Sequence, residues 1–180
     1  EQRKDEIYWD GLAECYHRGL VANVGVSNYG PTLLERAQEA LAKRGVPLAS
    51  NQIAFNLLCR RDGSLATVER GAELGVATLA YYPLAMGLLT GKLTGSRLRS
   101  RSDARSQDLL RYLEGGDGGT AGAIPANGIR PLLTVLHTVA AAEGRTPAQV
   151  ALNWIISKGA IPIVGATSQL QLEENLGATG

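Results

Sequence analysis

Hydrophobic positions along the chain follow two spacings. In some segments apolar residues recur every three or four positions, as on one face of an α-helix, and Gly or Pro marks the segment ends. In others, short runs of β-branched and apolar residues end at polar side chains, which is typical of strands. Helices are expected over the segment that ends at Gly19 and over residues 31–45, 64–75, 129–144, 146–159 and 167–178. Strands are expected over residues 21–28, 48–58, 76–84 and 160–166.

The order of these elements predicts an α/β fold. Strands that alternate with helices form right-handed βαβ units and therefore a parallel sheet. The expected strands are nearly all apolar, as is usual for strands covered on both faces. Two architectures fit this order: a doubly wound four-stranded sheet, and half of an eight-stranded (β/α)8 barrel.

Polar residues near the carboxyl ends of the expected strands favour the barrel. In a (β/α)8 barrel, that end of the strands carries the active site. No GxGxxG motif follows an expected strand, which weighs against a Rossmann domain. The polar residues at these ends are Ser27, Asn28, Gln52, Tyr81, Tyr82, Thr167 and Ser168.

Composition excludes several classes of protein. The chain has 180 residues, 44% of them hydrophobic, and a net charge of +1, so neither general disorder nor a global attraction to nucleic acid is expected. No apolar run approaches the roughly 18 residues of a membrane span. Two cysteines, Cys15 and Cys59, are too few for a disulfide scaffold and favour a reducing compartment. Because the chain opens on Glu1, it is interpreted as a processed chain or as part of a longer one.

The periodic pattern breaks between Met86 and Asn127. The first part of this stretch is basic and rich in turn residues, and the last part is rich in glycine. An irregular loop insertion at about residues 87–127 is therefore expected within one unit that spans residues 1–180. Residues 92–105 hold five Lys or Arg against one Asp. No aromatic side chain stands among them to stack on bases, so nucleic acid is not an expected partner.

Five segments resemble, in order and spacing, the C-terminal half of the aldo-keto reductases. They are VGVSNY, NQIAFNLL, AYYPLAMGLLTGK, TPAQVALNW and IPIVGATSQLQLEENLGA. The resemblance implies a (β/α)8 TIM barrel, of which this chain carries about strands five to eight with their helices. It also implies NADP (NADPH) as cofactor, a small-molecule carbonyl substrate, and no metal. The segments are similar to those of the plant- and alga-type and potassium-channel β-subunit-like branches.

The family's catalytic Asp, Tyr, Lys and His lie on or after its second to fourth strands, which the resemblance places upstream of Glu1. No catalytic residue is therefore assigned in this chain. Its two histidines, His17 and His137, lie in expected helices and are interpreted as surface or packing residues. The resemblance thus implies that the chain is the cofactor-binding half and is inactive alone. The missing N-terminal half, or a partner protein, is expected to close the barrel.

Four residues resemble the family's contacts with the nicotinamide ring. Tyr81 matches the aromatic side chain that stacks on the ring and blocks one of its faces. Ser27, Asn28 and Gln52 match the hydroxyl and amides that hold the ring's carboxamide. The alternative is that Asn28 caps the following helix and that Gln52 satisfies a buried backbone group.

The segment after the third expected strand resembles the family's diphosphate-binding loop. Gly87 lets the main chain approach a ligand closely. Lys92 matches a phosphate-contacting lysine in part of the family, with a solvated loop lysine as the alternative. Tyr82 stands where the family usually has Ser, so it is expected to point elsewhere or to reshape the pocket. The cofactor-binding residues expected here are Tyr82, Pro83, Leu84, Ala85, Gly87 and Lys92.

The turn into the last expected helix resembles the family's adenosine site. Exposed N–H groups and the helix dipole favour an anion there, which the resemblance identifies as the 2′-phosphate of NADP. Gln171 stands where many relatives have Arg, which weakens the expected preference for NADP over NAD. The residues expected at this end of the cofactor are Gly165, Ala166, Thr167, Ser168, Gln171, Glu174 and Asn175. For Glu174 and Asn175, matched to the adenine contacts, ordinary helix surface is the alternative.

The function expected from the resemblance is reduction of an aldehyde or ketone by hydride transfer from NADPH. The alternative is a non-catalytic structural or regulatory subunit, derived from a reductase, in a larger assembly. An isolated half-barrel exposes two sheet edges, which supports that alternative. The cytoplasm is the expected compartment. The chloroplast is the alternative, because two segments are similar to those of a branch with plastid members.

Overall fold

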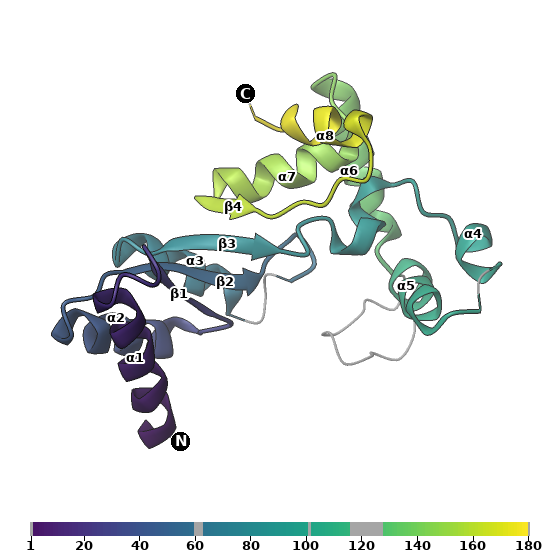
Figure 1. The fold of residues 1–180 in the computed structure, drawn as a ribbon. Helices are drawn as coiled ribbons and strands as arrows, with labels where there is room; N and C mark the ends of the chain where they lie inside the picture. The colour runs from purple at the N-terminus through teal and green to yellow at the C-terminus, as the bar shows by residue number, and fades with distance from the viewer. Residues whose placement is uncertain (1, 60–62, 101, 116–127, 180) are drawn as a thin grey trace.

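Four parallel strands form one sheet, in the order in which they occur along the chain. The computed structural model describes residues 2–59, 63–100, 102–115 and 128–179. The strands are β1 (Val24–Ser27), β2 (Leu48–Ala54), β3 (Ala77–Tyr81) and β4 (Ala160–Pro162). All neighbouring pairs are parallel, so the carboxyl ends of the strands lie at the same end of the sheet (Figure 1). The predicted α/β fold with a parallel sheet is confirmed.

The helices that precede and link the strands lie where the hydrophobic spacing predicts them. Thr146 and Gln149 form the capping box that their spacing indicates. In the part of the chain that the structure describes, no helix is long and apolar enough to cross a membrane. The bounds are α1 (Gln2–His17), α2 (Pro31–Lys43), α3 (Ser64–Glu73), α6 (Arg130–Ala142), α7 (Pro147–Ser157) and α8 (Gln169–Leu176).

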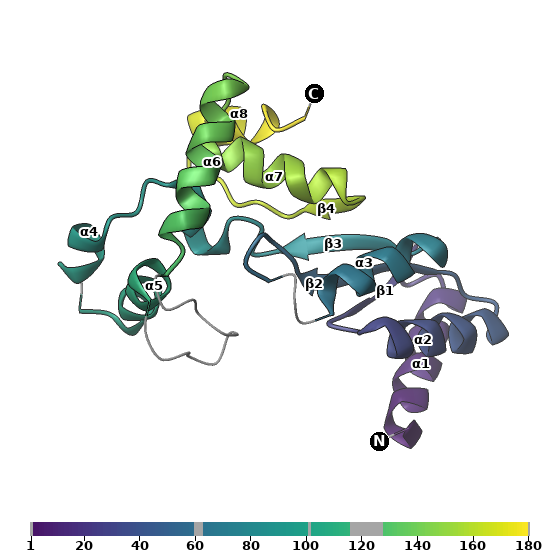
Figure 2. The same ribbon diagram turned by 180° about the vertical axis from the view of Figure 1, so that it is seen from behind.

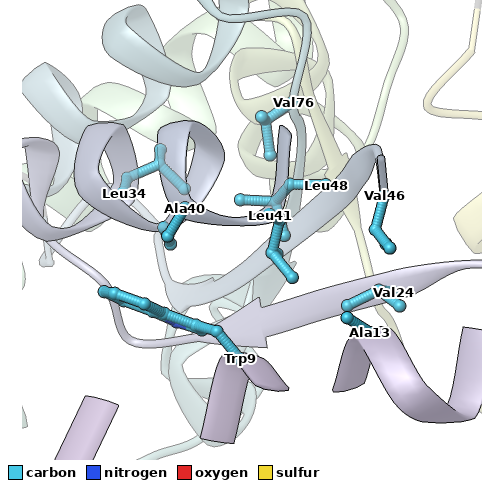
Figure 3. Close-up of a cluster of buried hydrophobic side chains, with 10 residues drawn as sticks. Trp9, Ala13, Val24, Leu34, Ala40, Leu41, Val46, Leu48 and Val76 are labelled. Carbon is cyan, nitrogen blue, oxygen red and sulfur yellow. The ribbon is translucent and has the colours of Figure 1, made fainter. Parts of the chain in front are cut away.

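Two hydrophobic cores hold α1, α2, α3 and α7 against the sheet. In the first, Trp9 of α1 and Leu41 of α2 pack with Val24 of β1 (Figure 3). In the second, Phe55 and Ile155 are fully buried between β2, α3 and α7. Burial of such large apolar side chains contributes about 1.5–3 kcal/mol each, and it fixes the helices on one face of the sheet.

The strand register separates a buried face from an open face. Paired residues of parallel strands point to the same side, and successive residues alternate. One buried row contains Asn51, Thr78 and Ala160, none more than 3% exposed. The next row contains Ser27, Gln52, Leu79 and Ile161, which are half-buried or exposed. The helices therefore cover the first face, and the second face is the open one.

The segment expected to be an irregular loop, at about residues 87–127, contains helices, and that expectation is wrong for them. The 3-10 helix η1 spans Ala85–Thr90, α4 spans Gly95–Arg99 and α5 spans Ala104–Glu114. Figures 1 and 2 show α4 and α5 side by side, away from the sheet. The glycine-rich part of the segment, residues 116–127, lies outside the described residues.

Caps and a local apolar cluster explain the helices of this segment. Thr94 and Asp103 accept hydrogen bonds from backbone N–H groups in the first turns of α4 and α5. Leu98, Leu109 and Leu113 are buried in one cluster with residues of η1 and α6. In the sequence, these apolar positions are spread among Arg, Ser and Asp, so the helical spacing is hard to recognise.

β1 ends one residue before its expected limit, and the other three strands end three or four residues before theirs. β2 ends at Ala54, because the side chain of Asn56 accepts hydrogen bonds from two backbone N–H groups that follow it. β3 ends at Tyr81, because Tyr82 has a φ of 54° and the chain leaves the extended conformation. β4 ends at Pro162, and the chain then runs beside η1 before it enters α8 (Figure 1).

Candidate functional site

Three of the residues expected to contact a nicotinamide ring share the open face of the sheet. Ser27 of β1 pairs with Gln52 of β2, and Gln52 pairs with Leu79 of β3. Tyr81 lies two residues beyond Leu79 and therefore points to the same side. A hydroxyl, an amide and an aromatic ring thus line one surface near the carboxyl ends of the strands.

Asn28 joins this surface from the turn after β1. Its φ is 59°, a region that Asn tolerates better than most residues. The Tyr81 hydroxyl donates to Asn28 Oδ1 at 2.9 Å. The Asn28 N–H and the Ser27 hydroxyl both donate to the Gln52 carbonyl oxygen, at 2.8 and 3.0 Å. These four residues, called the strand-end group below, connect the ends of β1, β2 and β3.

Neither Asn28 nor Gln52 takes the alternative structural role. The N-cap of α2 is Gly30, and no side chain caps that helix, so Asn28 is not its cap. The side chain of Gln52 is half-buried and makes no hydrogen bond with any other described residue. The amide of Gln52 therefore faces the open side of the sheet without a partner in the described part of the chain.

The chain after β3 takes a conformation that is rare for residues with side chains. Tyr82, Ala85 and Met86 have φ values of 54°, 47° and 55°, and Gly87 has 95°. Non-glycine residues with positive φ are uncommon, and such strain clusters at ligand-binding segments. Gly87 was expected to let the main chain approach a ligand closely, whereas no special backbone conformation was expected of Tyr82, Ala85 or Met86.

The side chains of this segment are mostly turned into the protein. Pro83 and Ala85 are buried, and Leu84 is half-buried against the core around η1. The Gly87 N–H donates to the Leu84 carbonyl oxygen at 2.9 Å. A ligand at this segment would therefore contact mainly its backbone.

Tyr82, the departure from the family pattern, lies beside Tyr81. Its side chain is 58% exposed. The two rings meet edge to face, with centroids 5.0 Å apart and planes at 74°. The Tyr82 carbonyl oxygen accepts hydrogen bonds from Asn56 Nδ2 and from the Ala85 N–H, both at 2.9 Å. Tyr82 thus extends the aromatic surface next to the strand-end group.

Lys92 and Glu174 contact each other across the fold. Lys92 Nζ lies 2.8 and 3.0 Å from the two carboxylate oxygens of Glu174. The hydrogen bond from Lys92 lowers the pKa of Glu174. Gln149 Nε2 donates to the Glu174 carbonyl oxygen at 2.9 Å and fixes that turn of α8. A phosphate at Lys92 or an adenine at Glu174 would compete with this ion pair.

The turn before α8 is exposed, and side chains of the turn and of α8 form hydrogen bonds with each other's backbone. Gly165, Ala166, Thr167 and Ser168 are all exposed. Ser168 caps α8 by accepting the Gln171 N–H at 3.3 Å. Gln171 Oε1 in turn accepts the Thr167 N–H at 2.8 Å. One N–H that an anion could use is therefore already bonded to Gln171.

The expected residues thus fall in two groups. One is the strand-end group. The other, called the α8-turn group below, consists of the turn before α8 together with Lys92, Glu174 and Asn175. Asn175 belongs to the latter because its Nδ2 donates to the Gly165 carbonyl oxygen at 3.5 Å. Both views show the chain between β4 and α8 passing beside η1, so the strained segment after β3 lies between the two groups (Figures 1 and 2).

Sequence reasoning did not single out Asn51 and Asn56. Both side chains are 1% exposed, and both bind backbone groups in the turns beside the strand-end group. A signal was present, because two Asn stand with Gln52 in the otherwise apolar run of NQIAFNLL and a buried amide must find hydrogen-bond partners.

The histidines lie outside both groups. His17 Nε2 donates to the Arg44 carbonyl oxygen at 2.8 Å, and His137 is exposed on α6. Along the ranges that the structure describes, no three His, Cys, Asp or Glu side chains come together where they could hold a metal ion.

A comparison with known protein families identifies the family of this chain. The family model described as Aldo/keto reductase family matches residues 2–179. The chain belongs to the aldo/keto reductase family. The resemblance in the five sequence segments is thereby confirmed, and so is membership of a family of oxidoreductases.

Individual aldo/keto reductases match nearly the whole chain. A chloroplastic pyridoxal reductase of Arabidopsis thaliana is 41% identical over 174 residues, 97% of this chain and 44% of the relative. The L-glyceraldehyde 3-phosphate reductase of Escherichia coli K12 is 32% identical over 172 residues, 93% of this chain and 47% of the relative. A crystal structure of the thermostable aldo-keto reductase Tm1743 with the inhibitor epalrestat matches with a TM-score of 0.63 and 27% identity, over 97% of this chain and 48% of that one. The chain thus spans about half the length of the curated relatives it matches.

Proposed function

We propose that the protein is an NADP-dependent aldo/keto reductase that reduces an aldehyde or a ketone, and that this chain supplies its cofactor-binding part. The observation that carries the proposal is the strand-end group. Ser27, Gln52 and Tyr81 share the open face, and Asn28 accepts a hydrogen bond from the Tyr81 hydroxyl. A flat ring beside a hydroxyl and amides suits a nicotinamide and its carboxamide.

The residues present fit both ends of NADP. At the strand-end group, Gln52 and Asn28 would hold the carboxamide while Tyr81 covers one face of the ring. At the α8-turn group, the exposed N-terminus of α8 with Thr167 and Ser168 would bind the 2′-phosphate. When bound, NADPH supplies the hydride that goes to the carbonyl carbon.

The middle of the cofactor would lie along the strained segment after β3. The backbone from Tyr82 to Gly87 would approach the diphosphate, because its side chains are mostly turned inward. Lys92 would then exchange its contact with Glu174 for a phosphate, and Glu174 would accept a hydrogen bond from the adenine amino group.

The acid and its supporting groups are proposed to lie outside residues 1–180. The family resemblance assigns proton transfer to an upstream Tyr, helped by Lys and His, and it matches none of these positions here. The N-terminal half of the barrel would supply them and would also pair with the open sheet edges.

The substrate is proposed to be an aldehyde, with pyridoxal as the first compound to test. The support is the pyridoxal reductase of Arabidopsis thaliana, 41% identical over nearly the whole chain. That relative is chloroplastic by name, which supports the chloroplast as the compartment over the cytoplasm. L-glyceraldehyde 3-phosphate is the second compound, from the more distant relative.

The test is cofactor binding followed by turnover. NADPH fluorescence is titrated with full-length protein, and oxidation of NADPH is then followed with pyridoxal and a panel of aldehydes and ketones. Binding that Tyr81→Ala weakens, together with oxidation that depends on the carbonyl compound, is the expected result. Absence of NADPH binding by the wild-type protein would overturn the proposal.

A non-catalytic subunit in a larger assembly is the second candidate, and one observation favours it. The outer strands β1 and β4 each have a single neighbour in the described part of the sheet, and Ile161 in β4 and Ile163 just after it are 54% and 45% exposed. Such an edge calls for a partner. NADPH binding without oxidation by any carbonyl compound, in full-length protein that forms a stable hetero-complex, would select this candidate.

A further inference from the structure

Two buried asparagines bind the turns beside the strand-end group, one after β1 and one after β3. Asn51 lies within β2 and Asn56 lies two residues after its end. Each is 1% exposed, and apart from these two the largest fully buried side chains are apolar. A buried amide is costly unless its donors and acceptor are all used, so the contacts of each one indicate what it does.

Asn51 holds the turn that carries Asn28. Its Nδ2 donates to the Tyr29 carbonyl oxygen at 2.8 Å, and its Oδ1 accepts the Tyr29 N–H at 3.3 Å. Both groups of the amide thus bind the backbone of one residue. Tyr29 directly follows Asn28, whose φ of 59° directs its side chain toward Tyr81.

Asn56 holds the turn that follows Tyr81. Its Nδ2 donates to the Tyr82 carbonyl oxygen at 2.9 Å. Its Oδ1 accepts the N–H groups of Leu58 and Cys59, at 2.8 and 3.0 Å. The amide thereby joins the chain after β2 to a residue whose φ is 54°.

We infer that Asn51 and Asn56 are positioning residues for the nicotinamide end of the cofactor. Asn51 binds the backbone of the residue after left-handed Asn28, Asn56 binds the backbone of left-handed Tyr82 itself, and the two side chains reach toward opposite neighbours of β2. Tyr81 and Asn28, which hydrogen-bond to each other, are thus fixed from both sides. The inference rests on the proposed function, because positioning has meaning only if this surface binds a cofactor.

The amide meets the requirements of both sites with a donor and an acceptor on separate atoms that reach different backbone groups. The site of Asn56 needs one donor and two acceptor positions, and the site of Asn51 needs one of each. Asn56→Asp keeps the size and the acceptors and removes the donor to Tyr82. Asn51→Asp likewise keeps the size and the acceptors and removes the donor to the Tyr29 carbonyl oxygen. A carboxylate would face the Tyr82 or Tyr29 carbonyl oxygen and push that turn away.

The experiment compares two ligands that occupy different parts of the proposed site. NADPH spans both groups of residues, whereas adenosine 2′,5′-bisphosphate carries only the end assigned to the α8-turn group. In full-length protein, Asn56→Asp and Asn51→Asp should each weaken NADPH binding by about 10-fold and leave bisphosphate binding unchanged. The two variants act on different turns, so each tests the inference if the other fails to fold.

A buried hydroxyl that contacts neither asparagine nor the strand-end group provides the control. Thr67 is 3% exposed, and its hydroxyl donates to the Gly63 carbonyl oxygen at 2.9 Å within α3. Thr67→Val should lower the melting temperature and change neither ligand's affinity. If the asparagine variants melt earlier but bind NADPH as the wild type does, or weaken both ligands equally, the positioning role is refuted. If the wild-type protein binds neither ligand, the proposed function itself fails.

Discussion

Backbone strain is concentrated where the cofactor is proposed to bind. In the described ranges, non-glycine residues with positive φ all follow the end of β1 or β3. A left-handed conformation costs about 1–2 kcal/mol for a residue with a side chain, so neighbouring contacts must hold it. The residues are Asn28, Tyr82, Ala85 and Met86.

Tyr81 combines a ring and a hydroxyl whose contributions can be separated. Tyr81→Phe removes the donor to Asn28 and keeps the ring, so the dissociation constant of NADPH should rise about 2–5-fold. Tyr81→Ala also removes the stacking surface, and the rise should be about 10-fold or more. NADPH fluorescence titration measures both dissociation constants. Tyr8→Phe is the control, because Tyr8 lies exposed on α1. Equal losses for Phe and Ala would show that the ring does not stack on the cofactor.

At the turn before α8, charge is expected to set the choice between NADP and NAD. The wild-type preference for NADP should be about 10-fold, because no Lys or Arg stands in the turn. Gln171→Arg adds a cation and frees the Thr167 N–H, so it should strengthen NADP binding and leave NAD almost unchanged. Ser168→Ala should weaken NADP alone. Titrations of both cofactors test this, and equal effects on the two would mean that the 2′-phosphate binds elsewhere.

The sequence predicted which of the site residues lie near the strand ends better than it predicted their contacts. Tyr81 and Asn28 follow from strands of known order, because parallel strands bring their carboxyl ends together. Lys92 and Glu174 are 82 positions apart, and no local spacing reveals their ion pair. Asn56 was missed for a related reason, since its partner Tyr82 lies directly after the next strand.

At the scale of elements, an ion pair ties the loop after η1 to α8. Lys92 lowers the pKa of Glu174 from its ordinary value of 4.5. The pair therefore stabilises the fold above about pH 4.5, and the contribution disappears as the pH falls through the lowered pKa. Lys92→Met should cost about 0.5 kcal/mol of unfolding free energy at pH 7, since Lys92 is exposed. The difference from wild type should vanish toward the acid end of the folded range.

Chemical unfolding of the cofactor-free protein at several pH values measures this difference. Arg18→Met is the control, because Arg18 Nη1 lies 3.6 Å from Glu14 Oε1 and both side chains are largely exposed. A Lys92→Met effect that stays constant at acid pH would show that packing of the lysine stem, not its charge, holds α8.

Local signals decided which elements were predictable. The capping box of Thr146 and Gln149 lies within four residues, so the start of α7 could be read directly. The helices α4 and α5 were missed, because their buried side chains pack on η1 and α6 rather than on the sheet. Without that contact in view, the Arg- and Ser-rich sequence resembles a solvated loop.

At the scale of the molecule, the sheet formed by the described residues is open at both edges. β1 and β4 each have one neighbour, and Ile161 is 54% exposed on the open face. Residues 1–180 expressed alone should therefore self-associate, or melt without a cooperative transition. Light scattering after gel filtration and a thermal melt test this. A monodisperse monomer with a cooperative melt would contradict it.

The same 180 residues alone should not reduce a carbonyl compound, even where they retain cofactor binding. The strand-end group offers a hydroxyl, amides and aromatic rings, and the family resemblance places the proton-donating Tyr and its Lys and His elsewhere. Loss of general acid catalysis costs roughly 10²–10⁴ in rate. NADPH oxidation by residues 1–180 with pyridoxal and an aldehyde panel should therefore equal a buffer blank, whereas full-length protein should exceed it. Reproducible oxidation above the blank would mean that a side chain within residues 1–180, with Tyr81 and Tyr82 the first to test, transfers the proton.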